Sequence, residues 1–137
     1  MDVHQQTVVS IFLTYNWCNE KVKRAVLPFE ITAQQYNVLR ILRNQYPEPS
    51  TVTFLKSKML DKMCDASRIV DRLLQKDLIR KESNSVDKRA VDVIISEKGL
   101  HLLGRMDDEV SFADLVASSL TKKEAEQLNE LLSKLRS

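Results

Sequence analysis

The stretch that decides the fold is ASRIVDRLLQKDLIRKE, residues 66–82, because a helical pattern gives way to a strand pattern within it. Over its first half the apolar residues recur at i, i+3, i+4, i+7 and i+8, and so form one stripe of a helix: Ala66, Ile69, Val70, Leu73 and Leu74. The opposite side is polar: Arg68, Asp71, Arg72 and Gln75. From Leu78 the residues become β-branched or alternating, which is typical of a strand. The stretch therefore predicts an amphipathic helix followed directly by a strand.

A shorter helix is predicted just before this one. Ser50 or Thr51 can cap it. Its inward residues would be Val52, Leu55 and Met59. Residues 60–62 then form a tight turn. A short helix, a tight turn and an amphipathic helix with a polar outer face describe a helix-turn-helix.

The strand that begins at Leu78 is expected to pair with a second one. Residues 78–82 and 91–95 are both short β-branched or alternating segments, and the residues between them, 83–89, are mostly polar or charged. The pattern predicts a β-hairpin with a long charged tip.

Helices flank this unit on both sides. A long first helix has apolar residues at three- and four-residue intervals up to Val26 and stops at Pro28. Thr32 and Gln35 form a capping box that begins a second helix, which runs to about Tyr46. The apolar residues of that helix cover more than one face, so we expect it to lie inside the fold.

Two helices are predicted to close the chain. Ser96 can cap the first, which would carry these apolar residues: Leu100, Leu103, Met106, Val110 and Ala113. A second capping box, Thr121 with Glu124, begins the last helix. The predicted fold class is mainly α with a small β-hairpin.

Composition agrees with one small helical domain. The 137 residues are 43% hydrophobic and 29% charged, and only 2 Gly and 3 Pro leave few turn residues for many-stranded sheets or phosphate-binding loops. Two cysteines provide no disulfide framework, and charged residues interrupt every apolar run before the roughly 20 residues that cross a bilayer. No signal peptide is visible, so we expect a cytoplasmic protein without membrane association.

The net charge of +2 hides an uneven distribution. Residues 52–91 carry 10 basic and 6 acidic side chains, whereas residues 92–137 carry 6 and 9. The basic part of the chain is therefore the part that holds the predicted helix-turn-helix and hairpin.

Residues 87–99, DKRAVDVIISEKG, resemble the wing signature of the multiple antibiotic resistance regulator (MarR) family. That signature reads Asp-x-Arg, an alternating strand, and then Ser or Thr, x, Lys and Gly. Residues 31–39 and 68–73 are similar to the family's second and recognition helices, so the likeness covers nearly the whole chain. It implies one MarR-like domain over residues 1–137, with a winged helix-turn-helix at 32–96 and dimerisation helices at 1–31 and 97–137.

The resemblance also implies a function. We expect a DNA-binding transcriptional regulator that is a homodimer on a palindromic operator in double-stranded DNA, and a repressor released by a small aromatic or anionic effector. The alternative is a winged-helix protein-interaction module whose basic face meets an acidic protein and binds no DNA. Sequence-selective, steeply salt-dependent DNA binding would separate the two.

Two segments depart from the family pattern. Members usually have Gly directly after the recognition helix, where a left-handed residue caps it, whereas this chain has Asp77. Asp tolerates that conformation better than most residues, so we expect the fold to be kept with a weaker cap. Residues 54–64 lack the family's usual Leu-Ala pair and Gly, so residue roles transfer less directly there.

The candidate DNA-binding residues lie on the recognition helix and in the turn before it. Ser67, Arg68 and Arg72 would face the major groove, where Arg can bond guanine bidentately. Asp65 could orient these arginines or accept from a cytosine amino group, and Lys62 could reach a phosphate. The alternative is an ordinary solvated helix face.

The hairpin tip carries two further candidates. Lys88 and Arg89 would contact DNA, since a narrow minor groove attracts Arg; the alternative is solubilising charge. Asp87 is acidic and cannot favour phosphate, so its expected part is structural, in holding the wing through a nearby Arg.

The flanking helices retain apolar faces that one short chain cannot all bury, so we expect an obligate dimer. Its interface should include Val9, Phe12, Leu128, Leu132 and Leu135. Four aromatic residues could line an effector pocket between the dimerisation and DNA-binding parts, and core packing is the alternative for them: Phe12, Tyr15, Trp17 and Tyr36.

No enzyme, cofactor or metal site is expected. The sequence has no Gly-rich phosphate loop, nucleophile elbow or clustered set of titratable residues. His4 and His101 stand apart from each other and from cysteine. Cys64 or Cys18 could sense oxidants, and the alternative is that both are inert apolar residues.

Overall fold

The structure, a computed structural model, describes residues 2–83, 86 and 90–137. It contains two compact units, Met1–Met106 and Asp107–Ser137. The elements of the first unit are α1 (Val3–Val26), the 3-10 helix η1 (Leu27–Phe29), α2 (Ala33–Gln45), β1 (Ser50–Thr51), α3 (Val52–Lys58), α4 (Ala66–Gln75), β2 (Ile79–Ser83), β3 (Val91–Ile95) and most of α5 (Glu97–Glu109). The second unit holds the end of α5, then α6 (Ala113–Ala117) and α7 (Lys122–Arg136).

Side-chain oxygens cap several helices where the sequence predicted them to start. At α2, Thr32 Oγ1 accepts the Gln35 N–H and Gln35 Oε1 accepts the Thr32 N–H, both at 3.1 Å, so the predicted capping box is confirmed. The box predicted at Thr121 for α7 is confirmed as well. Of the two candidate caps for α3, Thr51 is the one whose Oγ1 accepts a backbone N–H, that of Phe54.

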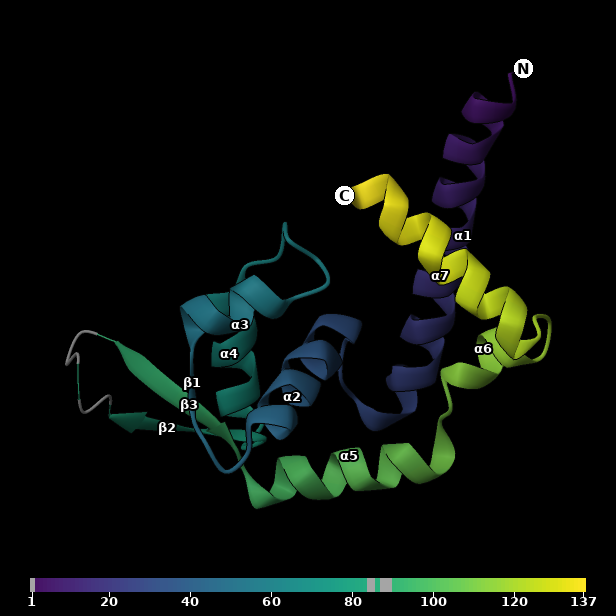
Figure 1. Ribbon diagram of the computed structural model, residues 1–137. Coiled ribbons are helices and arrows are strands. Elements are labelled where there is room, and N and C mark those ends of the chain that lie inside the picture. Colours follow the sequence, from purple (N-terminus) through teal and green to yellow (C-terminus); the bar gives the residue numbers. More distant parts are fainter. Residues whose placement is uncertain (1, 84–85, 87–89) are drawn as a thin grey trace. The chain divides into compact units, whose positions relative to one another are not determined.

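The core of the first unit lies where α2, α3 and α4 pack together and on the sheet (Figure 1). Its fully buried side chains come from all of these elements: Val38, Leu39 and Leu42 of α2, Leu55 of α3, Leu73 of α4, and Val93 and Ile95 of β3. Burial of each such side chain contributes about 1.5–3 kcal/mol. The prediction that α2 lies inside the fold is confirmed.

The sheet is antiparallel, with strand order β1-β3-β2. The predicted hairpin is confirmed: Ile79 pairs with Ile95 and Ser83 with Val91. A third strand, β1, was not predicted; it pairs Ser50 with Val93 on the other edge of β3. Two residues are too few to show an alternating pattern, so only the neighbouring strand makes them a strand. The fold class, mainly α with a small β-sheet, is as expected.

The prediction of two closing helices was wrong. The first of them, α5, ends at Glu109, so Val110 is not part of it, and Ala113 begins a separate short helix, α6. Residues 107–109 are all acidic and lie at the negative end of the α5 dipole, with no basic residue in that last turn. This charge pattern disfavours continuation of the helix.

Candidate nucleic-acid interface

Helix α4 buries one stripe and exposes the other, as predicted. Its buried residues are Ala66, Ile69, Val70 and Leu73, while Leu74 is half-buried. Ser67, Arg68 and Arg72 are exposed. Within the described part of the chain, neither guanidinium makes a hydrogen bond or ion pair, so both are available to an external ligand.

Asp65 is the N-cap of α4. Its Oδ1 accepts the backbone N–H of Arg68 at 3.1 Å, which satisfies one of the unpaired donors in the first turn. The sequence alone predicts this carboxylate only as a partner of the arginines or of a base. Asp65 is exposed, so contact with an arginine or a base stays a prediction. The contact that the structure shows is with the backbone of α4.

The turn between α3 and α4 is attached to α2 by two side chains. Asn37 Oδ1 accepts the Leu60 N–H at 2.9 Å, and Gln34 Nε2 donates to Asp61 Oδ2 at 2.9 Å. The other oxygen of Asp61 accepts the Met63 N–H at 2.9 Å. These contacts are not predicted from the sequence. The signal for them is that two amide side chains, Gln34 and Asn37, are three positions apart and so lie on one face of α2.

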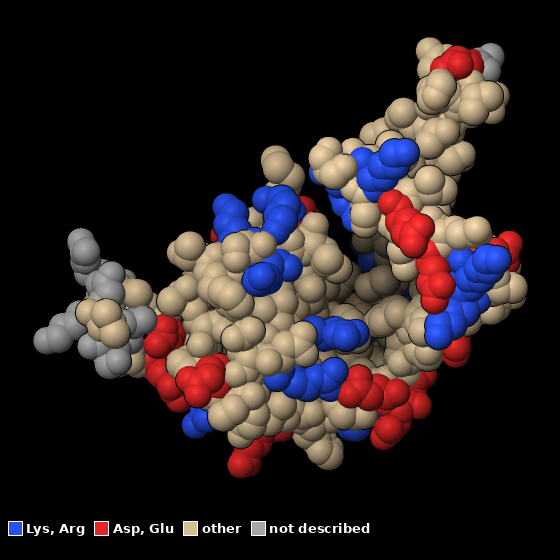
Figure 2. All heavy atoms as spheres, viewed as in Figure 1, with Lys and Arg blue, Asp and Glu red and all other residues tan. Residues whose placement is uncertain are grey.

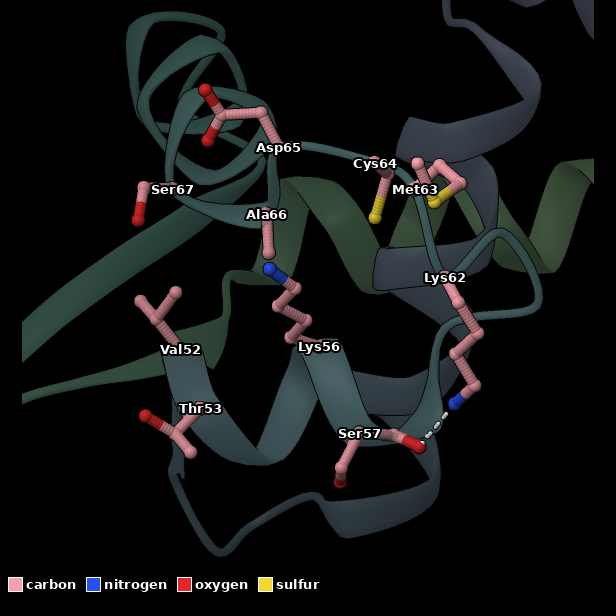
Figure 3. Close-up of a pocket in the computed structure, with 10 residues that line it drawn as sticks. All are labelled: Val52, Thr53, Lys56, Ser57, Lys62, Met63, Cys64, Asp65, Ala66 and Ser67. Atoms are coloured by element: carbon pink, nitrogen blue, oxygen red, sulfur yellow. Dashed lines mark hydrogen bonds between the residues drawn. The ribbon is translucent and has the colours of Figure 1, made fainter.

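A pocket of about 680 Å³ lies between α3 and the start of α4. Figure 3 shows Lys56 extending from α3 toward residues 65–67, and Lys62 in the turn. The Lys62 ammonium donates to the Ser57 carbonyl oxygen at 2.5 Å. Lys62, which is predicted to contact a phosphate, therefore also stabilises the end of α3. Figure 2 shows basic side chains gathered over α3 and the turn. Two exposed lysines of α3, Lys56 and Lys58, extend the basic surface beyond the residues predicted from the sequence.

Helix α4 ends in a Schellman motif. The Leu78 N–H donates to the Leu73 carbonyl and the Asp77 N–H to the Leu74 carbonyl, both at 3.1 Å. Asp77 has φ of 60°, the left-handed conformation expected at this position. The family's usual Gly is therefore replaced by a residue that adopts the same backbone conformation with some strain.

The signature residues after β3 hold this same helix end. Ser96 Oγ donates to the Asp77 carbonyl at 2.7 Å and accepts the Gly99 N–H at 3.1 Å, which caps α5 as predicted. Lys98 Nζ donates to the Lys76 carbonyl at 2.9 Å. Gly99 allows close approach, because a Cβ there would lie 2.3 Å from the Leu78 carbonyl oxygen. The signature thus serves the geometry of α4.

The hairpin strands expose two basic residues, Arg80 and Lys81. The predicted tip contacts, Lys88 and Arg89, and the predicted structural residue, Asp87, lie outside the described residues. Their roles stay predictions.

The residues predicted for a dimer interface are largely uncovered in each unit. Val9 and Phe12 are exposed on α1, of which only Val26 is buried. On α7 no residue is buried: Leu128 and Leu135 are exposed, and Leu132 is half-buried. Each unit by itself therefore leaves these apolar side chains uncovered.

The four aromatics suggested for an effector pocket lie in different surroundings. Phe12, Tyr15 and Trp17 are exposed on α1, whereas Tyr36 is buried in α2, where its hydroxyl accepts from Arg40 Nη1 at 3.2 Å. None of them lines the pocket between α3 and α4.

Cys64 is buried and Cys18 half-buried. Over residues 2–83, 86 and 90–137 there is no group of three or more His, Cys, Asp or Glu that could hold a metal ion. No helix in this part of the chain has the length and apolarity that a bilayer crossing requires.

Known proteins share the sequence and the fold of this chain. Residues 31–91 match the MarR family. The HTH-type transcriptional regulator MgrA of Staphylococcus aureus is 30% identical over 110 residues, which are 78% of this chain and 71% of MgrA. A mutant of MarR from E. coli, solved in complex with operator DNA, has a TM-score of 0.78 at 25% identity and covers 98% of this chain and 99% of its own. The organohalide-sensing regulator RdhR, in its 2,4-dichlorophenol-bound form, has a TM-score of 0.82 at 20% identity and covers 99% and 80%. The chain belongs to the MarR family of transcriptional regulators.

Proposed function

We propose that this protein is a homodimeric repressor that reads a palindromic DNA operator through α4 and is released by a small effector. The observation that carries the proposal is the outer face of α4. Arg68 and Arg72 are exposed there without a partner in the described chain, on a helix whose preceding turn is bonded to α2 and whose C-terminal end is bonded to Ser96.

The chemistry of this face suits base reading. Arg68 and Arg72 are four residues apart, so they project from one side of the helix, and each can bond O6 and N7 of guanine bidentately. Asp71 lies beside them, and its negative charge opposes indiscriminate phosphate binding. Ser67 can donate to or accept from a base edge.

Basic groups around α4 would fix the register on the duplex. Lys62 and Lys56 border the pocket at the start of α4, where they can meet phosphates. Lys88 and Arg89 would act at the hairpin tip, with Arg89 in the minor groove, while Asp87 would hold the tip. The relative MarR, solved with operator DNA, supports this use of the fold.

A dimer is supported by the uncovered apolar residues of α1 and α7. Two such chains related by a twofold axis present two copies of α4, and these require two half-sites of inverted sequence. The operator is therefore a palindrome in this proposal. A regulator that binds DNA and catalyses no reaction is expected in the cytoplasm.

A small aromatic or anionic effector is the proposed signal for release. The fold is shared with RdhR, which senses organohalides and was solved with a chlorophenol. In this chain the aromatic residues of α1 and Tyr36 of α2 are the candidate lining.

Selection of bound sequences from a random DNA library tests the function. The expected result is a palindromic site whose affinity falls steeply with salt. Binding to an acidic protein with no selected DNA sequence would instead establish the protein-interaction alternative.

Single-base variants of the selected site then test the residues. Arg68→Ala should relax the preference at one position in each half-site, whereas Lys88→Ala should lower affinity for all sequences and reduce the salt slope by about one unit. Lys122→Ala, on α7, removes the same charge as a control and should leave both quantities unchanged. An Arg68→Ala protein with the wild-type ranking at every position would contradict base reading by α4.

A further inference from the structure

Lys76, the C-cap residue of α4, reaches across to the start of α2. Its Nζ donates to the Glu30 carbonyl oxygen at 2.5 Å and to Gln35 Oε1 at 3.1 Å. Glu30 has φ of 60° and ends η1. The side chain therefore connects the end of α4 to the corner at which the chain turns from α1 into α2.

The acceptors of Lys76 are themselves held in place. Gln35 is 7% exposed, and its Oε1 also accepts the Thr32 N–H of the capping box. One amide oxygen therefore serves both the beginning of α2 and the end of α4. Such a shared acceptor couples the positions of the two helix ends.

The backbone of the same residue is attached to a third element. The Lys76 carbonyl accepts from Lys98 Nζ in the first turn of α5. Lys76 is thus joined through its side chain to the corner after α1 and through its carbonyl to α5. These are the two segments that lead out of the winged helix-turn-helix, toward each end of the chain.

We propose that Lys76 is a positioning residue, which sets α4 against the start of α2 and so controls DNA affinity without touching DNA. The inference rests on the proposed DNA-binding function. A reading helix must be held within about 0.5 Å of its productive placement. Ser96 and Lys98 attach the C-terminal end of α4 to the start of α5, and the Lys76 side chain adds a link from that end to the start of α2. Lys76 is half-buried with its ammonium on protein acceptors, which distinguishes it from the exposed arginines of α4.

The test compares Lys76→Met, which keeps an unbranched side chain one atom shorter and loses the donors, with Lys76→Arg, which keeps donors. Binding is measured at several salt concentrations against the operator selected by the wild-type protein, and thermal unfolding is used to correct for the folded fraction. We expect Lys76→Met to weaken binding about tenfold per folded dimer with an unchanged salt slope, and Lys76→Arg to recover most of the loss. Lys21→Met, an exposed position on α1, removes the same charge and should bind like the wild type.

Two results would overturn the inference. A salt slope lower by about one unit would make Lys76 a phosphate contact, and wild-type affinity per folded dimer with only a lower melting temperature would make it a purely structural lysine.

Amide hydrogen exchange tests the inference without DNA. Lys76→Met should speed exchange in the last turn of α4, at Leu73–Leu78, relative to Lys21→Met, and unchanged exchange there would also overturn the inference. If the wild type binds no DNA, the proposed function fails, and the exchange result still decides whether Lys76 restrains the helix.

Discussion

Replacing Gly99 with Ala should destabilise the protein, because the residue lies against backbone. A Cβ at this position would be 2.3 Å from the Leu78 carbonyl oxygen and 2.7 Å from Cγ1 of Ile95. Ordinary contact begins near 3.4 Å, so the first turn of α5 must move by about 1 Å. The Leu78 carbonyl resists this movement, since it also accepts the Ser96 N–H at 3.1 Å.

The net effect follows from two opposing terms. Overpacking destabilises a protein by about 1–3 kcal/mol, and the upper end applies here because the new Cβ would overlap a backbone atom. The better helix propensity of Ala stabilises the folded state by at most about 1 kcal/mol. We expect a net loss of about 2 kcal/mol, which lowers Tm by about 6–10 °C in a chain of this length.

Gly104 provides a matched control on the same helix. Apart from its chain neighbours and the backbone of its own helix, nothing lies within 4 Å of a Cβ built there, so Gly104→Ala should raise stability by up to about 1 kcal/mol through helix propensity. Thermal unfolding of the two variants and the wild type, followed by circular dichroism at one protein concentration, measures both shifts. Shifts of the same sign and size at both positions would refute the reasoning that close approach dictates Gly99.

The remaining predictions concern the helix end, the wing and the dimer. Asp77→Gly should raise stability by about 1 kcal/mol in urea unfolding, because it relieves a left-handed non-glycine residue; a loss would show that the Asp side chain stabilises the cap. Arg89→Ala should weaken operator binding by about 1–3 kcal/mol at fixed moderate salt with no change in Tm, and unchanged affinity would remove the hairpin tip as a minor-groove reader. In sedimentation at micromolar concentration the wild type should be a dimer and Phe12→Asp, at a 65% exposed position, should shift it toward monomer; a monodisperse wild-type monomer would contradict the proposed interface.

Most of the fold could be predicted because its signals are local. The capping boxes at Thr32 and Thr121 each lie within four residues of sequence, and the stripe of α4 repeats at the helical period over nine. Each signal states where a helix begins or which face it buries. The errors came where local signal is weak or mixed, in a two-residue strand and in the acidic end of α5.

The candidate site could be predicted only in its exposed part. Arg68 and Arg72 follow from the helical spacing, since whatever is opposite the buried stripe must face outward. The contacts that hold the helix join residues far apart in sequence: Asn37 with Leu60, and Lys76 with Gln35. No periodicity marks such pairs, because a single amide or ammonium acquires its partner only when the elements pack.

These supporting contacts show what the signature residues after β3 do in this chain. Ser96, Lys98 and Gly99 contact the backbone of residues 76–78. These contacts require a particular backbone conformation there and do not involve any side chain of α4. The outward side chains can therefore differ between regulators without disturbing the support of the helix. In this chain the turn bonded to α2 holds the start of α4 and the contacts at residues 76–78 hold its end, so in the proposed function its exposed face is left to determine the DNA sequence that it binds.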